Sequence, residues 1–426
     1  DRFLESLSSG VQVLSLFKAN PSILNLLMDI CGAAPALAEY LSHNPSVLDF
    51  VVDRSFFDAL PNKTILTRDF KERLNEAGDY EDVLNCARRW VKENQFRTGV
   101  HLLKGFSTVR KISESFSNIA EVCLVVLFDK VQEHFSQRYG SIPGLGASIL
   151  AMGKLGSREM SLGSDLDLIV IYDSSSEKLS GGKFKISAPV YFSRLTQSFI
   201  SAITVATSEG KLFKVDMRLR PSGNKGPVAT SLSAFEFYQV NEAWVWERLA
   251  LSRSRVLNGN SLLLKKLNKI INNALNSKLR SQKVISEVSS MRVRLRDSEL
   301  DSRVYGNPKY GTGRLQELEI LIQMGALLKK SFNSSSPYKM IKDLYSTKFF
   351  DKNEAQKCSD AYRYYFNLQQ ILNIIVTSKI EDGSMKSVQK IFKNHNFVYS
   401  YNDIHQALDS YSKDINEIFE SKLIYE

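Results

Sequence analysis

The sequence predicts an α+β protein, in which a core built on a mixed sheet lies between two helical regions. Apolar residues recur at three- and four-residue steps up to about residue 140. Short apolar runs bounded by glycine-rich turns follow from Gly140, and helical spacing returns after about residue 230. A chain of 426 residues is long enough for two or three domains. We therefore expect a helical domain at 1–140, an α/β core at 141–260 and a helical bundle at 261–426.

The first region is expected to contain short helices followed by two longer ones. Asn20-Pro21 and Asn44-Pro45 interrupt its apolar pattern, and each fits a helix end followed by proline in the first turn of the next helix. The longer helices are predicted from Tyr80 to Lys104 and from about Asn118 to Tyr139. This part of the chain is therefore interpreted as a set of packed helices.

The middle region carries the predicted strands. Apolar, β-branched runs between turn residues place these strands at 147–152, 167–173, 203–208 and 211–219. Glu209-Gly210 would form a hairpin turn between the last two strands. The segment from Val190 to Ser201 is amphipathic and is predicted to be helical.

The last region is predicted to be largely helical. Long periodic stretches run over Leu262–Leu275, Gln282–Leu300, Arg314–Lys330, Ala355–Lys379 and Ile404–Leu423. The polar string FNSSSP, Phe332 to Pro337, separates two of them. No internal repeat is visible.

Composition favours a soluble, cytoplasmic protein. No apolar run approaches the roughly 20 residues of a membrane helix, and the start DRFLESLSSG lacks the layout of a secretory signal. Because this start is Asp rather than Met, we expect a fragment of a longer protein. Four scattered cysteines indicate reduced thiols, and five histidines show no zinc-binding spacing. The net charge of +10 is compatible with nucleic acid, a membrane surface or an acidic protein as partner.

A pair of aspartates opens the most apolar predicted strand. Asp165 and Asp167 precede the run Leu168 to Ile171. Side chains two residues apart in a strand share a face, so the two carboxylates would repel each other unless a cation lay between them. Mg²⁺ prefers such hard oxygen ligands. The alternative is two surface aspartates at the start of a strand, one of them facing solvent.

Two glycine-bearing turns near this pair favour phosphate binding. Gly163-Ser164 directly precedes the aspartates and could offer backbone N–H groups and a hydroxyl to a phosphate. Upstream, the string MGKLGS carries Lys154, which could reach phosphate oxygens although it does not lie in a P-loop motif.

A third carboxylate, Asp216, lies in the string VDMRLRPSG. If its strand lies beside the first, Asp216 joins the pair, and Arg218 and Arg220 lie on the same face, along which a triphosphate would extend. The set indicates two Mg²⁺ ions bridging the carboxylates and a nucleotide triphosphate, with Asp216 placed to help deprotonate the attacking hydroxyl. A charged surface strand is the alternative.

Longer strings resemble a known family. GSDLDL followed by an aspartate on a later strand resembles the nucleotidyltransferase superfamily related to DNA polymerase β. The strings AMGKLGSREMSLGSDLDLIVIYD, VDMRLRPSGNKGPVATSLSAFEFYQ and NEAWVWERLALSRSRVL closely resemble glutamine synthetase adenylyltransferase, a bifunctional adenylyl-transferring and adenylyl-removing enzyme. The helical flanks, for example CARRWVKENQFRTGVHLLKG, resemble it too. That family has two homologous halves, and the lead-in Asn241 to Trp244 resembles the C-terminal, adenylyl-adding half.

The resemblance implies a polymerase β-like nucleotidyltransferase core and a specific reaction. ATP and a tyrosine hydroxyl of glutamine synthetase would give adenylyl-tyrosine and pyrophosphate, with Mg²⁺ or Mn²⁺ as cofactor. Control by a PII-type signalling protein and by glutamine is implied as well. In this sequence, Asp165 and Asp167 match the family's metal pair, Gly163 and Ser164 its phosphate turn, and Asp216 its third carboxylate.

One motif departs from the family pattern. NPKYGTGRLQELEILIQ, Asn307 to Gln323, stands where the family has a glycine-rich turn followed by Asp-Ile-Glu-Phe. Glu317 takes the place of the aspartate, Glu319 is kept, and Arg314 stands where a glycine is usual. Glu317 and Glu319 are therefore possible accessory residues of the site. Alternatively, they only place negative charge near a helix N-terminus, where it is favourable.

Two further groups have structural interpretations. Trp244 and Trp246 are expected to pack the core onto the following helices, with substrate binding as the alternative. The arginine cluster is expected on a solvated helix, with an acidic protein partner as the alternative. Its members are Arg292, Arg294 and Arg296.

Four functions stay open from the sequence. The first is AMP transfer to glutamine synthetase, and the second is the adenylyl-removing, phosphorolytic reaction of the same family. The third is an RNA-directed nucleotidyltransferase, against which stands the absence of a base-stacking platform or RNA-binding motif. The fourth is a regulatory scaffold that binds nucleotide without turnover, which the altered segment at Glu317 would favour.

Overall fold

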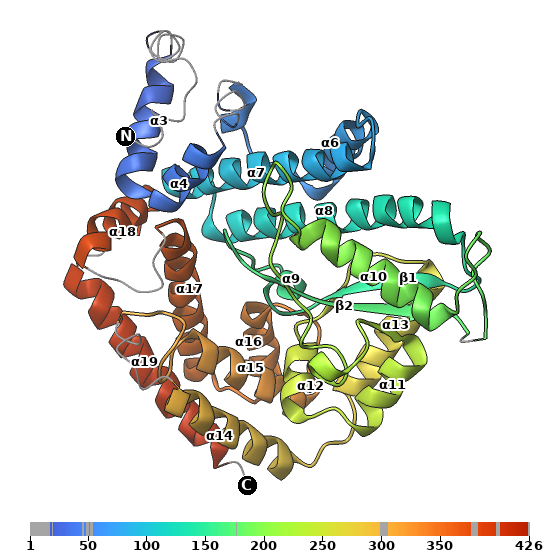
Figure 1. Ribbon diagram of the computed structural model, residues 1–426. Coiled ribbons are helices and arrows are strands. Elements are labelled where there is room, and N and C mark those ends of the chain that lie inside the picture. Colours follow the sequence, from blue (N-terminus) through green and yellow to red (C-terminus); the bar gives the residue numbers. More distant parts are fainter. Residues whose placement is uncertain are drawn as a thin grey trace.

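The computed structural model describes residues 20–44 and 54–424 apart from Ser176 and the segments 299–305, 376–381 and 398–400, together with the single positions 18, 47 and 51. Six helices are described in the N-terminal region: α3 (Pro21–Ala33), α4 (Pro35–His43), the 3₁₀ helix η1 (Arg54–Phe57), α6 (Lys63–Asn75), α7 (Tyr80–Lys104) and α8 (Val109–Tyr139). Figure 1 shows α7 and α8 side by side above the sheet.

Local capping explains where the two long helices begin. The Asp79 side chain accepts a hydrogen bond from the backbone N–H of Asp82, and Gly105 ends α7 in the left-handed conformation, so the predicted helix over 80–104 is confirmed. The next helix begins earlier than predicted, because Thr108 caps it by accepting the N–H of Lys111. Pro21 opens α3 as expected, whereas residues 45 and 46 lie outside the described part.

The core contains five short strands and five helices. The strands are β1 (Gly146–Ala151), β2 (Leu166–Asp173), β3 (Val215–Asp216), β4 (Ala229–Ser231) and β5 (Arg255–Val256). The helices are α9 (Gly153–Ser157), α10 (Ala188–Thr204), the 3₁₀ helix η2 (Gly223–Lys225), α11 (Leu232–Asn241) and α12 (Val245–Leu251).

The sheet is mixed, with β2 at its centre. β1 pairs antiparallel with β2 and with β5, while β3 and β4 both run parallel to β2 at different positions along its length. The apolar run Leu168 to Ile171 is fully buried, because β2 has neighbours on both sides and helices over its faces. The strand order brings the start of β3 beside the start of β2.

Of the four predicted strands, the one at 203–208 is wrong and the one at 211–219 is confirmed only in part, and Arg88 bears on the first of these. The segment expected as a strand at 203–208 begins as the last turn of α10. The buried guanidinium of Arg88, on α7, donates hydrogen bonds to the carbonyl oxygens of Ala202, Val205 and Gly210 at 2.9, 2.6 and 2.7 Å. Backbone acceptors held by a side chain from another helix are not free to pair in a sheet.

The strand predicted at 211–219 exists but is much shorter than expected. Of the predicted span 211–219, only Val215–Asp216 pairs in the sheet. The predicted turn does exist, because Thr207 and Gly210 exchange backbone hydrogen bonds at 3.0 and 2.9 Å, but no strands flank it. The strands β4 and β5 are only three and two residues long, which is too short for an alternation of apolar and polar residues to be detected in the sequence.

The C-terminal region is helical, as predicted. Its described helices are α13 (Ser261–Leu275), α14 (Ser281–Ser298), α15 (Leu315–Lys329), α16 (Pro337–Ser346), α17 (Lys352–Ile374), α18 (Asp382–Asn394) and α19 (Tyr401–Leu423). The expected helix ends at 300 and 379 lie outside the described residues, and the spacing did not predict α16 or α18. Figure 1 shows this region curving round the core so that α18 meets α3.

Among the described residues, no single helix has the length and apolar character needed to cross a membrane. Only the bent pair Ile23–Ala33 and Pro35–His43 passes that test together, by length and composition, with an angle of 119° at the break.

Candidate active site

The site is built on the first residues of β2. Asp165 is exposed just before the strand, and Asp167 is half-buried one step inside it, between the buried Leu166 and Leu168. The backbone N–H of Leu166 donates to the carbonyl of Lys214 at 2.9 Å, which fixes the approach of β3. The apolar strand therefore holds both aspartates at the edge of a rigid sheet.

Asp216 lies beside Asp167, as predicted. The two residues are register partners of the parallel strands β2 and β3. Burial raises the pKa of Asp167, and the nearby carboxylates of Asp216 and Asp165 raise it further. A cation at this edge would relieve that repulsion, so the local electrostatics favour binding of positive charge.

In this structure, the positive charge nearest to Asp216 is Arg218. Its Nη2 and Nε donate to Oδ2 of Asp216 at 2.5 and 2.8 Å, and its backbone N–H donates to Oδ1 at 2.8 Å. These hydrogen bonds hold the pKa of Asp216 below its usual range. In the described part of the chain, no group of three or more histidine, cysteine, aspartate or glutamate side chains is placed to hold a metal ion.

Arg220 lies beyond the end of the strand that was expected to carry it, although its charge still helps to lower the pKa of Asp216. The strand ends at Asp216, so two-residue alternation does not extend to Arg220. Its buried guanidinium donates to the carbonyl oxygens of Met217 and Gly226 at 2.8 and 3.4 Å. Arg220 therefore closes the loop that follows β3.

The turn between β1 and α9 packs directly against Asp167. Gly153 has φ +53°, and a Cβ atom at this position would lie 2.4 Å from Oδ2 of Asp167. The backbone N–H of Met152 donates to the carbonyl of Asp167 at 2.9 Å. Only glycine allows the helix to begin this close to the carboxylate.

Lys154 follows this turn and points toward the C-terminal helices. Its Nζ donates to Oε1 of Gln369, on α17, at 3.2 Å. Burial lowers the pKa of Lys154 to about 8, and the neighbouring Lys309 adds to the effect. A phosphate close by would favour the charged form of this buried ammonium group.

The second predicted phosphate turn, Gly163-Ser164, is held by hydrogen bonds between Ser164 and Ser161. Gly163 has φ +73° with open space around it. The Ser164 hydroxyl lies 2.8 Å from Oγ of Ser161 and accepts the N–H of Ser161 at 3.0 Å. The turn precedes Asp165 directly, so it lies at the same edge of the sheet as the carboxylates.

Arg253 is a buried residue of the site to which the sequence reasoning gave no role. It is 7% exposed, and it forms ion pairs with Glu319 at 2.7 Å and Glu159 at 3.1 Å. It also donates to Oγ of Ser157 at 2.9 Å. One guanidinium thus joins α15 to the end of α9, within electrostatic range of Asp167. The sequence did hold a signal for this residue, because Arg253 is a charged residue in the string SRSRVL, which lies in a half-apolar segment.

Glu317 and Glu319 contact different partners, because residues that are two positions apart on a helix point to nearly opposite faces. Glu319 meets Arg253. Glu317 is buried and accepts hydrogen bonds from Nε of Arg292 at 3.0 Å, Nε of Arg296 at 2.7 Å and the N–H of Gly313 at 2.9 Å.

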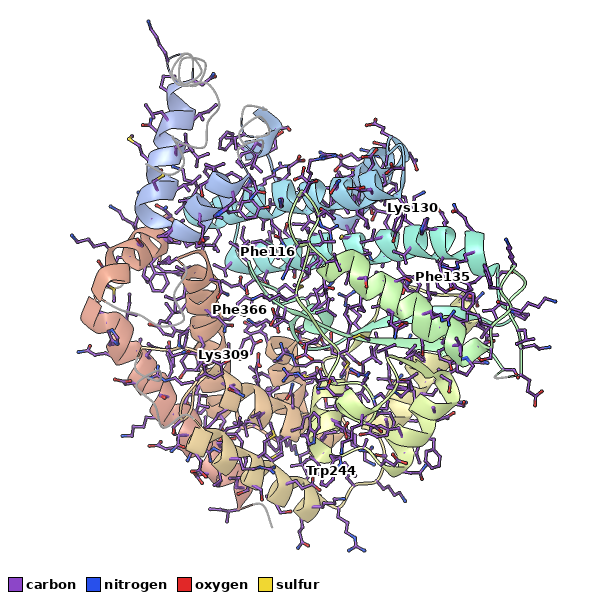
Figure 2. All side chains as sticks on the ribbon, in the orientation of Figure 1. Phe116, Lys130, Phe135, Trp244, Lys309 and Phe366 are labelled. Carbon is purple, nitrogen blue, oxygen red and sulfur yellow. The ribbon has the colours of Figure 1, made fainter. Side chains whose placement is uncertain are left out.

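Two structural expectations for the surroundings are wrong. Arg292 is buried and Arg296 is half-buried on Glu317, so only Arg294 of that cluster is exposed. Trp244 and Trp246 are 63% and 42% exposed, because they begin α12 at the surface and line a shallow cavity against α14. Figure 2 shows Trp244 at the edge of the molecule, away from the sheet.

Comparison with known proteins gives a consistent family match. A family model described as "Glutamate-ammonia ligase adenylyltransferase" matches residues 24–270. The bifunctional glutamine synthetase adenylyltransferase/adenylyl-removing enzyme of Brucella suis biovar 1 (strain 1330) is 36% identical over 378 residues, which cover 88% of this chain and 38% of that protein. The enzyme of the same name from Bradyrhizobium diazoefficiens is 31% identical over 429 residues, covering 99% and 43%.

A third relative extends over the whole chain. The protein of the same name from Rhodopseudomonas palustris (strain ATCC BAA-98 / CGA009) is 32% identical over 430 residues, which cover 100% of this chain and 43% of the relative. The chain therefore spans about two fifths of the length of the curated relatives that it matches.

Proposed function

Because the chain belongs to the glutamate-ammonia ligase adenylyltransferase family, we propose that it transfers AMP from ATP to a tyrosine hydroxyl of glutamine synthetase and releases pyrophosphate. The observation that carries the proposal is the pairing of Asp167 with Asp216 on adjacent parallel strands of a small mixed sheet. Crowded carboxylates beside a glycine turn and an arginine suit a reaction in which positioning and charge neutralisation do most of the work.

Three carboxylates are proposed to hold divalent cations, for which they would have to draw closer together than they lie here. Asp165, Asp167 and Asp216 offer only hard oxygen donors, as Mg²⁺ or Mn²⁺ prefer. The pKa of Asp167 is raised mainly by burial and further by the neighbouring carboxylates, and a cation would relieve that second contribution. When bound, such ions would neutralise the triphosphate and lower the pKa of the attacking hydroxyl. Binding at Asp216 requires that Arg218 leave its carboxylate, since the guanidinium contacts both oxygens.

The remaining site residues have roles toward the nucleotide. Arg218, once released, would contact the triphosphate, and Lys154 would contact phosphate from the turn at Gly153. Gly163 and Ser164 would shape the turn against the phosphates. Asp216 would accept the proton of the attacking tyrosine. Arg220 would support this arrangement by closing the loop that carries Arg218.

Transfer of labelled AMP from ATP to glutamine synthetase tests this proposal. Asp165→Asn and Asp167→Asn should each reduce labelling by roughly two orders of magnitude or more, the size expected when a main electrostatic contribution is removed. Asp173→Asn is the matched control, because Asp173 ends the same strand and pairs with Lys266 on the surface at 2.8 Å. Equal labelling by Asp167→Asn and the parent protein would sink the proposal.

The adenylyl-removing reaction is the second candidate, because the relatives' names carry both activities. Incubation with adenylylated glutamine synthetase and phosphate separates the two, since phosphorolysis releases ADP. Control by a PII-type protein and by glutamine, and a cytoplasmic location, belong to the same proposal and are supported by the sequence resemblance.

A further inference from the structure

A second cavity lies on the far side of α9 from the aspartates. It has a volume of about 460 Å³ and is lined by the first turn of α8, the residues that follow α9, the start of α16 and one face of α17. The first residue of α9, Gly153, faces Asp167, whereas its last residue, Ser157, lines this cavity. The volume lies within the range of small-molecule sites.

The cavity has the electrostatics of an anion site. Two helices begin at its wall: α8 at Val109 and α16 at Pro337, and each helix N-terminus carries a partial positive charge. Four cationic side chains line it, but only two carboxylates do. The cations are Arg110, Arg158, Lys339 and Arg363, and the carboxylates are Glu114 and Glu159.

The charges of the lining are not fully neutralised by one another. Glu159 is already shared with Arg253 and accepts the hydroxyl of Ser336 at 3.1 Å. Arg110 meets Glu114 at 3.4 Å, while its guanidinium also lies 5.6 Å from the ring centre of Tyr338. No ion pair of Lys339 is present among the described residues. Arg158 pairs with Glu121 at 3.3 Å and Arg363 with Asp360 at 2.8 Å, so among the described residues Lys339 is the lining cation that would meet an incoming anion without a carboxylate partner.

Aromatic rings form the other part of the lining. Tyr362 and Phe366 stack with their ring centres 6.1 Å apart, and Tyr338 lies 6.2 Å from Tyr362. Figure 2 shows Phe366 on α17, between the N-terminal helices and the C-terminal bundle. The Tyr362 side chain is 2% exposed, and its buried hydroxyl lies against the carboxylate of Glu159 at the cavity wall.

We propose that this cavity binds a nucleoside monophosphate, with the phosphate at the helix N-termini and the base against the aromatic side of α17. Two helix ends, the hydroxyls of Ser334 and Ser335 and a cationic rim suit a phosphate, and flat rings suit a base. The site is separate from the carboxylates but shares one wall with them, because Ser157 and Glu159 line the cavity and both contact Arg253.

Calorimetric titration with AMP in EDTA tests the proposal, because removing divalent ions leaves the carboxylates without the cations that a nucleotide there would need. Lys339→Glu should weaken AMP binding by about tenfold or more, the loss expected for one charge-assisted contact. Lys342→Glu is the matched control: the same change on the same helix, at an exposed position that does not line the cavity. Asp167→Asn should leave AMP binding unchanged.

Competition identifies the chemistry of the ligand. Inorganic phosphate should displace AMP, and adenosine should compete far less well. The proposal is overturned if AMP shows no saturable binding in EDTA, if Lys339→Glu and Lys342→Glu weaken it equally, if Asp167→Asn abolishes it, or if adenosine binds as tightly as AMP. Loss of the AMP-transfer reaction with AMP binding intact would count against the proposed function alone.

Discussion

Arg218 and Asp216 form a closed ion pair at the edge of the sheet, with Nη2 of the arginine 2.5 Å from Oδ2 of the aspartate. The same aspartate is the register partner of Asp167. A cation and Arg218 would therefore compete for one carboxylate.

Arg218→Ala should separate metal binding from transfer. Without the guanidinium, the pKa of Asp216 should rise toward its ordinary value, but both oxygens become available to a cation. We expect Mn²⁺ to bind the free protein more tightly, as measured by electron paramagnetic resonance, and AMP transfer to slow because the triphosphate loses a contact. Arg218→Lys should show weaker versions of both changes. Unchanged Mn²⁺ affinity in Arg218→Ala would show that the ion pair does not restrict the site.

Gly153→Ala should abolish the site without unfolding the protein. The new Cβ would meet Oδ2 of Asp167 at 2.4 Å, so the carboxylate or the turn must shift. Gly210→Ala is the control, because its φ of +78° imposes similar backbone strain of about 1 kcal/mol while nothing lies within 4 Å of the added atom. Thermal unfolding should change similarly for both variants, and AMP transfer should fall far more in Gly153→Ala.

Lys154 should give nucleotide binding an alkaline limit. Its pKa of about 8 means that the ammonium group is lost above that pH in the free protein. ATP affinity should therefore fall as the pH rises through 8, whereas Lys154→Arg should keep its affinity up to about pH 10, because arginine does not deprotonate there. Isothermal titration across this range checks the difference, and parallel pH profiles for the two proteins would contradict it.

The same lysine affects stability with a defined sign. Between pH 8 and the ordinary lysine pKa of about 10.4, the unfolded chain binds one more proton than the folded chain. The free energy of unfolding should therefore rise with pH across this window, relative to Lys154→Met. Urea unfolding at pH 7.5, 8.5 and 9.5 measures the trend; a free energy of unfolding of the parent that falls with pH relative to Lys154→Met would contradict the assignment.

Arg253→Met should destabilise the fold strongly. It leaves the buried Glu159 and the half-buried Glu319 without their shared cation, and removing one partner of a buried ion pair typically costs about 3–5 kcal/mol. The triple variant Arg253→Met, Glu159→Gln and Glu319→Gln should recover much of the loss, because the unpaired charges are then gone. Denaturant unfolding compares the three proteins. A triple variant no more stable than Arg253→Met would show that packing of the guanidinium, not charge pairing, matters.

Glu317→Asp should lower stability and bring no gain in transfer. The shorter side chain reaches Arg292, Arg296 and the N–H of Gly313 less well, and all three lie on the side of α15 away from Arg253. We expect a loss of about 1–2 kcal/mol in unfolding free energy. A higher rate of AMP transfer in this variant would instead support the accessory role predicted for Glu317.

The sequence predicted the parts of the fold that depend on local patterns. The helix over 80–104 has apolar residues at helical spacing, a capping residue before it and a glycine after it, and β2 has a continuous run of apolar residues that are buried. The neighbourhood of Asp167 and Asp216 also followed, because each aspartate stands at a fixed place on its strand.

Long-range contacts account for the rest. The strand expected at 203–208 is not formed, because its first two residues belong to α10 and Arg88, more than a hundred residues earlier, binds the carbonyl of Val205. The burial of Arg292 depends on Glu317 and on Glu420 of α19, which no local window contains. Arg253 was overlooked for the same reason: its two carboxylate partners come from opposite sides of the sequence.

The contacts of Arg88 also bear on how the chain can be divided. The change of sequence texture near residue 140 invites expression of the following part alone. Such a piece would lose the guanidinium that satisfies Ala202, Val205 and Gly210, as well as Glu121 of α8, which pairs with Arg255 at 2.7 Å. The helices before residue 140 thus supply hydrogen bonds and an ion pair that the core needs, and we expect the two parts to fold only when they are joined.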